Sequence, residues 1–182
     1  MNIPNKWADI NVNQYIKLMD LYNSEIDEID LTFKRLSIIL NISEEEVYNI
    51  ELSEYNKIKE EIKFLETPPS NLKDVSVIKL DGVEYNLIEL DKIKFGQLVD
   101  LEYYSKDLLN NIHHIISLLY NVDYKLVGEK MDIETALSVF FYIYALGMSF
   151  LPSDTKDYSM LDIAIQRMKL EKKKIKKELE KI

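Results

Sequence analysis

Apolar residues recur three and four positions apart along most of the 182-residue chain, and this spacing predicts a series of helices. The first two are expected over 12–22 and 25–40. Ser43 and Glu46 form a capping box that starts a short third helix, and Ser53 is expected to cap a fourth over 54–67. The prolines at 68–69 end this run, because proline has no amide donor and restricts the residue before it. The buried stripe expected for the second helix comprises Ile26, Ile29, Phe33, Leu36, Ile39 and Leu40.

Alternation of apolar and polar residues replaces the helical spacing in 75–80 and 83–88. Asp81 and Gly82 lie between these runs and fit a two-residue hairpin loop, in which both residues need positive φ. Helical spacing returns over 95–105 and then from 107 or 110 to 120, whereas 121–132 is expected to be a polar turn region around Gly128. No internal repeat is evident. The most apolar helix is expected over 133–151, with core residues Phe140, Phe141, Tyr144, Met148 and Leu151.

The predicted fold class is therefore α+β: predominantly helical, with one antiparallel β-hairpin at about 75–88 and a long C-terminal helix. Three parts are expected: an N-terminal helical part over 1–67, a hairpin plus helices sharing a core over 72–153, and a basic amphipathic helix over 154–182. The hairpin is expected to pack on the helices of 95–120 and 133–151. Trp7, the single tryptophan, is expected to cap the core rather than to contact a partner.

The run of 19 residues without a charge over 135–153 raises the question of a membrane span, since a spanning helix needs about 20 apolar residues. Its polar content and its acidic flanks, Glu134 and Asp154, argue for a buried central helix instead. A tail-anchored membrane protein is the alternative. The segment before Trp7 has no apolar stretch of the kind that a secretory signal contains.

Charge is unevenly distributed along the chain. The net charge is −9, yet 167–182 holds eight basic and three acidic residues, a net of +5, which leaves −14 for 1–166. So acidic a body would repel a phosphate backbone, which argues against nucleic-acid binding by the body. The basic tail carries a seam with steps of four and three that fits either a coiled coil, which allows self-association, or a helix lying back on the body. The seam residues are Leu161, Ile165, Met168, Lys172, Ile175, Leu179 and Ile182.

The chain offers little for catalysis. It has no cysteine, and its two histidines, His113 and His114, are adjacent, so on a helix they point about 100° apart and cannot share one metal ion without distortion. One is expected to face the core beside Ile112 and Ile116, and the other solvent. No nucleophile motif or phosphate-binding loop is present in the sequence. We therefore expect a non-enzymatic protein without catalytic residues, cofactor or metal.

A scattered set of motifs carries a family resemblance over roughly 7–151. It comprises Pro4 and Trp7 before Gln14-Tyr15, the Ser43–Glu46 box, Phe64-Leu65, Gly82 with Tyr85, Phe95-Gly96-Gln97 with Asp100-Leu101-Glu102, Asn110 with His113 and Ile116, Leu119-Tyr120, and Phe140-Phe141. In these residues the chain resembles the tail assembly chaperones and related baseplate-hub assembly proteins of long-tailed bacteriophages, some of which are virion-associated. Those relatives often follow the Leu-Tyr pair with Arg-Pro, where this chain has Asn121-Val122.

The resemblance implies a factor of the host cytoplasm that binds a structural phage protein, of tail, tape-measure or baseplate type, during assembly. The alternative that it leaves open is a minor structural component of the virion. No catalytic role comes with the resemblance. The expected partner-binding residues are the tail seam together with Tyr103 and Tyr104.

Overall fold

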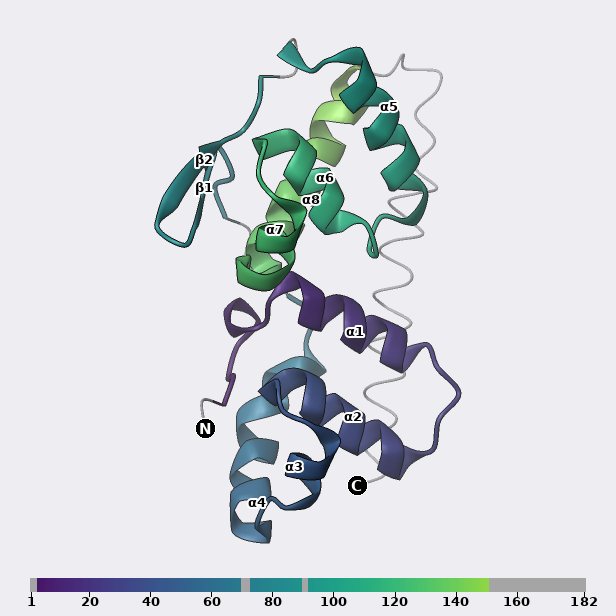
Figure 1. Cartoon of the computed structure of the whole chain (residues 1–182), viewed down its shortest axis with the longest axis vertical. Coiled ribbons are helices and arrows are strands. Elements are labelled where there is room, and N and C mark those ends of the chain that lie inside the picture. Colours follow the sequence, from purple (N-terminus) through teal and green to yellow (C-terminus); the bar gives the residue numbers. More distant parts are fainter. Residues whose placement is uncertain (1–2, 70–72, 90–91, 151–182) are drawn as a thin grey trace.

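The computed structural model of the chain describes residues 3–69, 73–89 and 92–150 (Figure 1). This part contains eight α-helices and one two-stranded antiparallel hairpin, which confirms the predicted α+β, mostly helical fold. The C-terminal helix predicted over 154–182 lies outside the described residues. The α-helices are α1 (Val12–Tyr22), α2 (Glu28–Leu40), α3 (Glu44–Tyr48), α4 (Leu52–Glu61), α5 (Phe95–Tyr104), α6 (Ile112–Tyr120), α7 (Tyr124–Lys130) and α8 (Ile133–Phe150). Short 3-10 helices are η1 (Trp7–Asp9), η2 (Ile62–Glu66) and η4 (Ser105–Asp107), and the strands are β1 (Val77–Leu80) and β2 (Val83–Asn86).

The hairpin forms as the sequence predicts. Asp81 and Gly82 at its loop have φ of 47° and 81°, so both turn residues lie in the left-handed region that a two-residue loop requires. Ile78 and Leu80 on β1 are buried, and β1 contacts α7. The loop therefore sets a register that points the apolar side of β1 at the helices.

Three sequence predictions about the helices are wrong. Residues 121–132 are not a turn region but contain α7, whose N-terminus is capped by the carboxylate of Asp123, which accepts from the amide of Lys125 at 2.9 Å. Helix α4 begins at Leu52, so Ser53 lies inside it rather than capping it. Helix α2 begins only at Glu28, after the cap Asp27, and Ile29 in its first turn is 70% exposed instead of buried.

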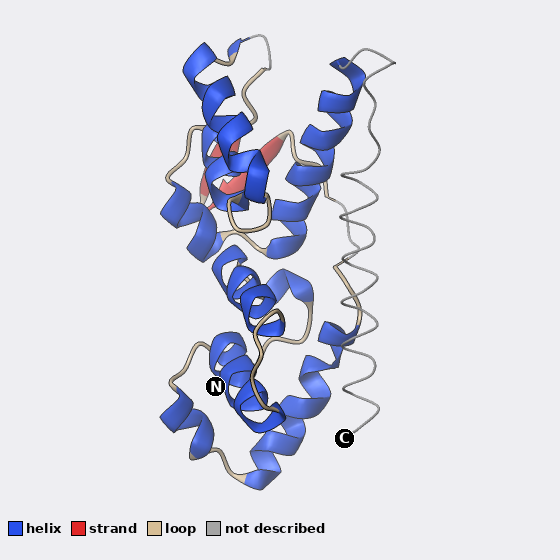
Figure 2. Cartoon of the chain, turned by 90° about the vertical axis from the view of Figure 1, so that its right-hand side faces the viewer, coloured by secondary structure: helices blue, strands red, loops and turns tan. Residues whose placement is uncertain are grey.

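The elements stack along the long axis of the molecule, with α2, α3 and α4 at one end and α5 at the other (Figures 1 and 2). Between them α1 packs on α7 and α8. The junction includes an antiparallel bridge in which the Val12 amide donates to the Met131 carbonyl at 3.1 Å and the Ile133 amide to the Ile10 carbonyl at 2.9 Å. Residues distant in the sequence are thus joined by backbone bonds as well as by side chains.

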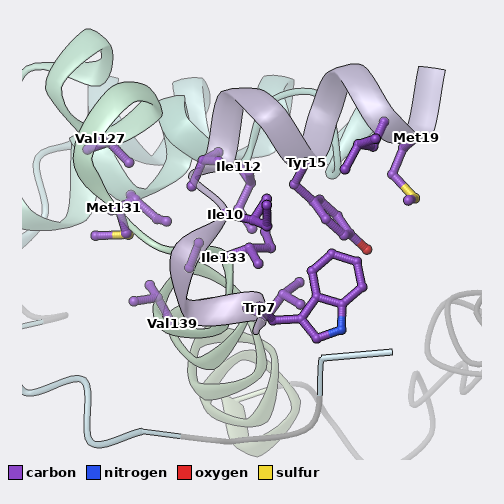
Figure 3. Close-up of a cluster of buried hydrophobic side chains, with 14 of the residues drawn as sticks. Trp7, Ile10, Tyr15, Met19, Ile112, Val127, Met131, Ile133 and Val139 are labelled. Carbon is purple, nitrogen blue, oxygen red and sulfur yellow. The ribbon is translucent and has the colours of Figure 1, made fainter. Parts of the chain in front are cut away.

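Trp7 is buried in the core, as predicted. Its indole Nε1–H donates to the Thr67 carbonyl at 2.6 Å, and its ring meets Tyr15 and Phe64 edge-on with centroids 5.7 Å and 5.3 Å apart. Figure 3 shows Trp7 beside Tyr15, with Ile10 further into the cluster. The single tryptophan therefore helps to cover the side of α1 that carries Tyr15.

The first half of α8 is buried through Ile133, Ala136 and Val139. Phe140 and Phe141 are partly buried against the same core, whereas the side chains of 143–150, and Leu151, lie outside what the structure describes, and with them the predicted core positions Tyr144, Met148 and Leu151. None of the helices that the structure describes combines the length and the apolar character that crossing a bilayer requires.

The helices contain an internal repeat, which the sequence analysis missed. Gln14 at the start of α1 accepts from the Asn11 amide and donates through Nε2 to the Ile38 carbonyl near the end of α2, both at 3.0 Å. Gln97 at the start of α5 does the same: it accepts from the Lys94 amide at 3.1 Å and donates to the Leu118 carbonyl at 3.3 Å near the end of α6.

The second helix of each unit also ends in the same way. Asn41 after α2 and Asn121 after α6 are left-handed, with φ of 53° and 50°. The hydroxyl of the serine four positions earlier, Ser37 or Ser117, donates to the carbonyl that follows the asparagine. A capped short helix, α3 or α7, then begins. The units α1–α2–α3 and α5–α6–α7 are therefore two versions of one motif, and a fourth helix, α4 or α8, follows each.

Candidate interaction surface

Helix α5 has no buried residue, although it is strongly apolar. Phe95, Leu98, Val99 and Tyr103 are all exposed, and Phe95 is 81% exposed. Because residues three and four apart share one side of a helix, these four side chains form a continuous apolar stripe, which we call the α5 face. Exposed contiguous apolar surface of this kind marks interaction sites.

The opposite side of α5 packs against the rest of the protein. Leu101 and Tyr104 on the opposite side of α5 pack against the core. The hydrogen bond from the Gln97 side-chain amide to the Leu118 carbonyl joins the start of α5 to α6. At the other end, the Ser105 hydroxyl donates to the Leu101 carbonyl at 2.6 Å. The exposed stripe is thus a feature of a packed helix and not of a loose segment.

A stack of aromatic and imidazole rings continues from the α5 face across α6 and α7. Tyr103 meets Tyr104 edge-on at 5.4 Å, and the Tyr104 ring lies parallel to that of His114, with centroids 4.7 Å apart and planes 7° apart. His114 in turn lies 4.2 Å from His113 and 4.6 Å from Tyr124. We call these five residues the ring stack. It extends the α5 face with flat, weakly polar surface.

Burial shifts both imidazoles of the ring stack toward the neutral form. Burial, together with the nearby His114, lowers the pKa of His113 to about 4, and burial also lowers the pKa of His114. The Nδ1 atom of His113 is buried without a hydrogen-bond partner among the described residues. The prediction that one histidine faces the core and the other solvent is wrong, because both are half-buried against tyrosine rings.

The partner-binding residues predicted from the sequence separate into two groups. Tyr103 and Tyr104 lie together, the first exposed on the α5 face and the second within the ring stack. The seven seam residues of the tail all lie outside the described residues, so the seam stays a prediction. Sequence reasoning missed Phe95, Leu98 and Val99, because an apolar stripe at helical spacing is ordinarily assigned to the core.

A second exposed apolar patch lies at the opposite end of the molecule. Tyr48 at the end of α3 is 77% exposed and stacks on Phe33 of α2 with centroids 6.3 Å apart. Ile29, one turn before Phe33, and Leu52 at the start of α4 are also exposed. This α3–α4 patch lies in an acidic segment, since 25–54 holds nine acidic and two basic residues.

A partly exposed ion pair between Lys73 and Asp132 stabilises the fold. Lys73 Nζ lies 2.7 Å from Asp132 Oδ1, and the same carboxylate accepts from the Thr135 amide at 3.0 Å and from its hydroxyl at 2.7 Å. Asp132 therefore caps α8, and its hydrogen bonds from Lys73 and Thr135 outweigh burial and lower its pKa. In the described part of the chain, no group of three or more His, Asp or Glu side chains is placed to hold a metal ion.

Comparison with known proteins adds no relative. A scan against models of protein families and searches of curated proteins and of solved structures found no match to this chain.

Proposed function

We propose that this chain is a non-enzymatic assembly factor that binds a structural protein of a bacteriophage tail or baseplate in the host cytoplasm. The observation that carries the proposal is the α5 face: four exposed apolar side chains in register on a helix whose other side is packed. The family resemblance, through Gly82, Tyr85 and the 95–102 motif, supplies the phage context.

The chemistry of the α5 face favours an apolar helix as its ligand. Residues 92–107 hold three basic and three acidic residues, so the surface has no net charge to attract an ionic partner. Burying an exposed phenylalanine, leucine or valine contributes about 1.5–3 kcal/mol per side chain. An assembly factor with such a face would shield apolar surface on its partner until the partner is incorporated. The tail seam is a second predicted contact.

A tagged pull-down of the full chain from infected cells, with mass spectrometry of the eluate, tests the proposal. Leu98→Asp places a charge in the stripe and should reduce recovery of the partner at least tenfold, which corresponds to about 1.4 kcal/mol of binding energy. Val83→Asp is the matched control, because Val83 is a similarly exposed apolar residue on the hairpin, away from the α5 face.

The pull-down, together with the protein content of finished particles, distinguishes an assembly factor from a structural component of the virion. Recovery of a tail, tape-measure or baseplate protein, with the factor absent from finished particles, supports the assembly factor. Presence of the chain in purified particles would instead support the alternative, a minor structural component. If the Leu98→Asp and Val83→Asp proteins bring down the same proteins in the same amounts, the α5 face is not the binding site.

A further inference from the structure

The two repeat units are covered to different extents. Residues of α5 stand 83 positions after their counterparts in α1, as Gln97 stands after Gln14. Val12 and Tyr15 of α1 are buried, whereas their counterparts Phe95 and Leu98 are exposed. In the first unit, η1, α7 and α8 cover this side of the first helix. In the second unit, no described element covers it.

Helix α7, which covers α1, has a counterpart in the first unit, α3, whose surface is exposed. Helix α7, the third helix of the second unit, packs on α1, and its counterpart α3 stands 80 positions earlier, as Val47 stands before Val127. Gly128 of α7 lies directly against the side chain of Asn13, since a Cβ at Gly128 would come within 2.8 Å of Asn13 Cγ. The counterpart of Gly128 is Tyr48, which is 77% exposed.

We infer that a second copy of this chain docks its α3–α4 patch on the α5 face, and so repeats between molecules the packing of α7 and α8 on α1 within one molecule. Figures 1 and 2 show the two surfaces at opposite ends of the long axis, so one molecule can use both at once. The repeat identifies the occupant. Helix α5 shares with α1 the glutamine that donates to the end of the following helix, and α3, like α7, follows a left-handed asparagine and begins at a residue whose side chain caps it.

Side-chain sizes at the proposed contact are complementary. The counterpart of Asn13 is Gly96, around whose Cβ position no atom lies within 4 Å. In the internal junction a glycine on α7 faces a larger residue on α1, and between copies a tyrosine on α3 would face a glycine on α5. Tyr48 therefore meets open space on α5 where a side chain would otherwise stand.

The backbone bridge of the internal junction also has counterparts. Asn11 pairs with Asp132 in that bridge, and the equivalent positions are Lys94 before α5 and Leu52 at the start of α4. Leu52 is exposed, and in the docked pair the neighbouring Glu51 would lie near Lys94, which is also exposed. The docking would thus place the acidic 25–54 segment beside the lysine that precedes α5, a local charge complementarity on a surface without net charge.

Such a contact is heterologous, because the surface used on one copy differs from the surface used on the next. Heterologous contacts give rings or open chains instead of a closed two-fold dimer. The inference shares the α5 face with the proposed function but does not depend on a phage partner.

Sedimentation velocity of the full chain at about 5–500 µM, a span chosen to cover micromolar to millimolar dissociation constants, is the test. Wild type should form species that grow with concentration. Tyr48→Ser, which removes one surface, and Phe95→Asp, which removes the other, should each raise the dissociation constant at least tenfold. An equimolar mixture of the two variants should form a dimer that stops at two subunits, because one intact surface of each kind remains. Val83→Asp is the control and should associate like wild type.

The inference is overturned by a wild type that stays monomeric throughout, by variants that associate like wild type through the tail, or by a mixture that forms no dimer. Partner capture reports separately on the proposed function. Tyr48→Ser should leave it intact, whereas Phe95→Asp should reduce it. If the Tyr48→Ser protein loses self-association but still captures its partner, both the proposed function and the docking between copies are supported. If the wild type is monomeric but still captures its partner, only the docking between copies is overturned.

Discussion

Acidification from pH 7 to pH 5 should destabilise the protein through His113. Burial lowers the pKa of its imidazole to about 4 in the folded state, against an ordinary value of about 6.5. A base whose pKa is lower in the folded state binds protons preferentially when unfolded, so stability falls as the pH drops below 6.5 and levels off near 4. Between pH 7 and pH 5 this difference in proton binding would lower the free energy of unfolding by about 1.8 kcal/mol. Solvent screening of the half-buried ring reduces the loss to about 1 kcal/mol.

Urea unfolding at pH 7 and pH 5, followed by far-UV circular dichroism, measures this loss. His113→Phe keeps a ring against Tyr124 and His114 but removes the titrating group, so its loss of stability over the same interval should be smaller by about 1 kcal/mol. The lowered pKa of Asp132 acts only below about pH 4, outside the chosen interval. The reasoning is refuted if wild type and His113→Phe lose the same stability between the two pH values.

Five further variants test the caps and turns by urea unfolding. Gly82→Ala should cost about 1–2 kcal/mol because φ is +81°, whereas Gly96→Ala, with open space around its Cβ, should stabilise helix α5 by about 0.5–1 kcal/mol; equal effects would contradict the assignment. Lys73→Met should cost about 1 kcal/mol at pH 7 by leaving Asp132 without its cation, and less below pH 4, where the carboxylate is protonated. Asn41→Ala and Asn121→Ala should each cost about 1–2 kcal/mol, since both residues are left-handed, and similar losses would support their equivalence in the repeat.

Local rules in the sequence predicted the elements whose residues carry strong signals. The Asp81-Gly82 loop fits only a narrow set of turns, and Ser43 with Glu46 closes a capping box in the structure, where each binds the other's amide. Helix α1 begins and ends where the apolar spacing places it. In each of these cases the determining contacts lie within four residues along the chain, so the sequence alone contains them.

Two of the missed features, α7 and the α5 face, involve contacts between residues distant in the sequence. Helix α7 has polar flanks, and it is stabilised by Val127 packed in the core and by the close approach of Gly128 to Asn13, neither of which a local pattern reveals. The α5 face was missed for the opposite reason: its spacing is that of a buried helix, and only the fold shows that nothing among the described residues covers it.

The repeat itself leaves a sequence trace that apolar periodicity does not detect. A serine, an asparagine four residues later, an aliphatic residue, a capping Ser or Asp and then a valine recur as Ser37–Val47 and Ser117–Val127. These positions are turn and cap residues, which set how one helix follows another independently of the side chains on the helix surfaces.

Repeat proteins need their terminal surfaces covered, since each unit leaves an apolar face for its neighbour. In this chain Trp7 contributes to that cover on α1, with its indole tied to Thr67, and no described element does so on α5. Phe95, which is 81% exposed, thus lies on a repeat face that no element of the described part of the chain covers. A structural partner and a second copy of the chain would each bury this stripe, as a neighbouring unit buries the corresponding face in a longer repeat protein.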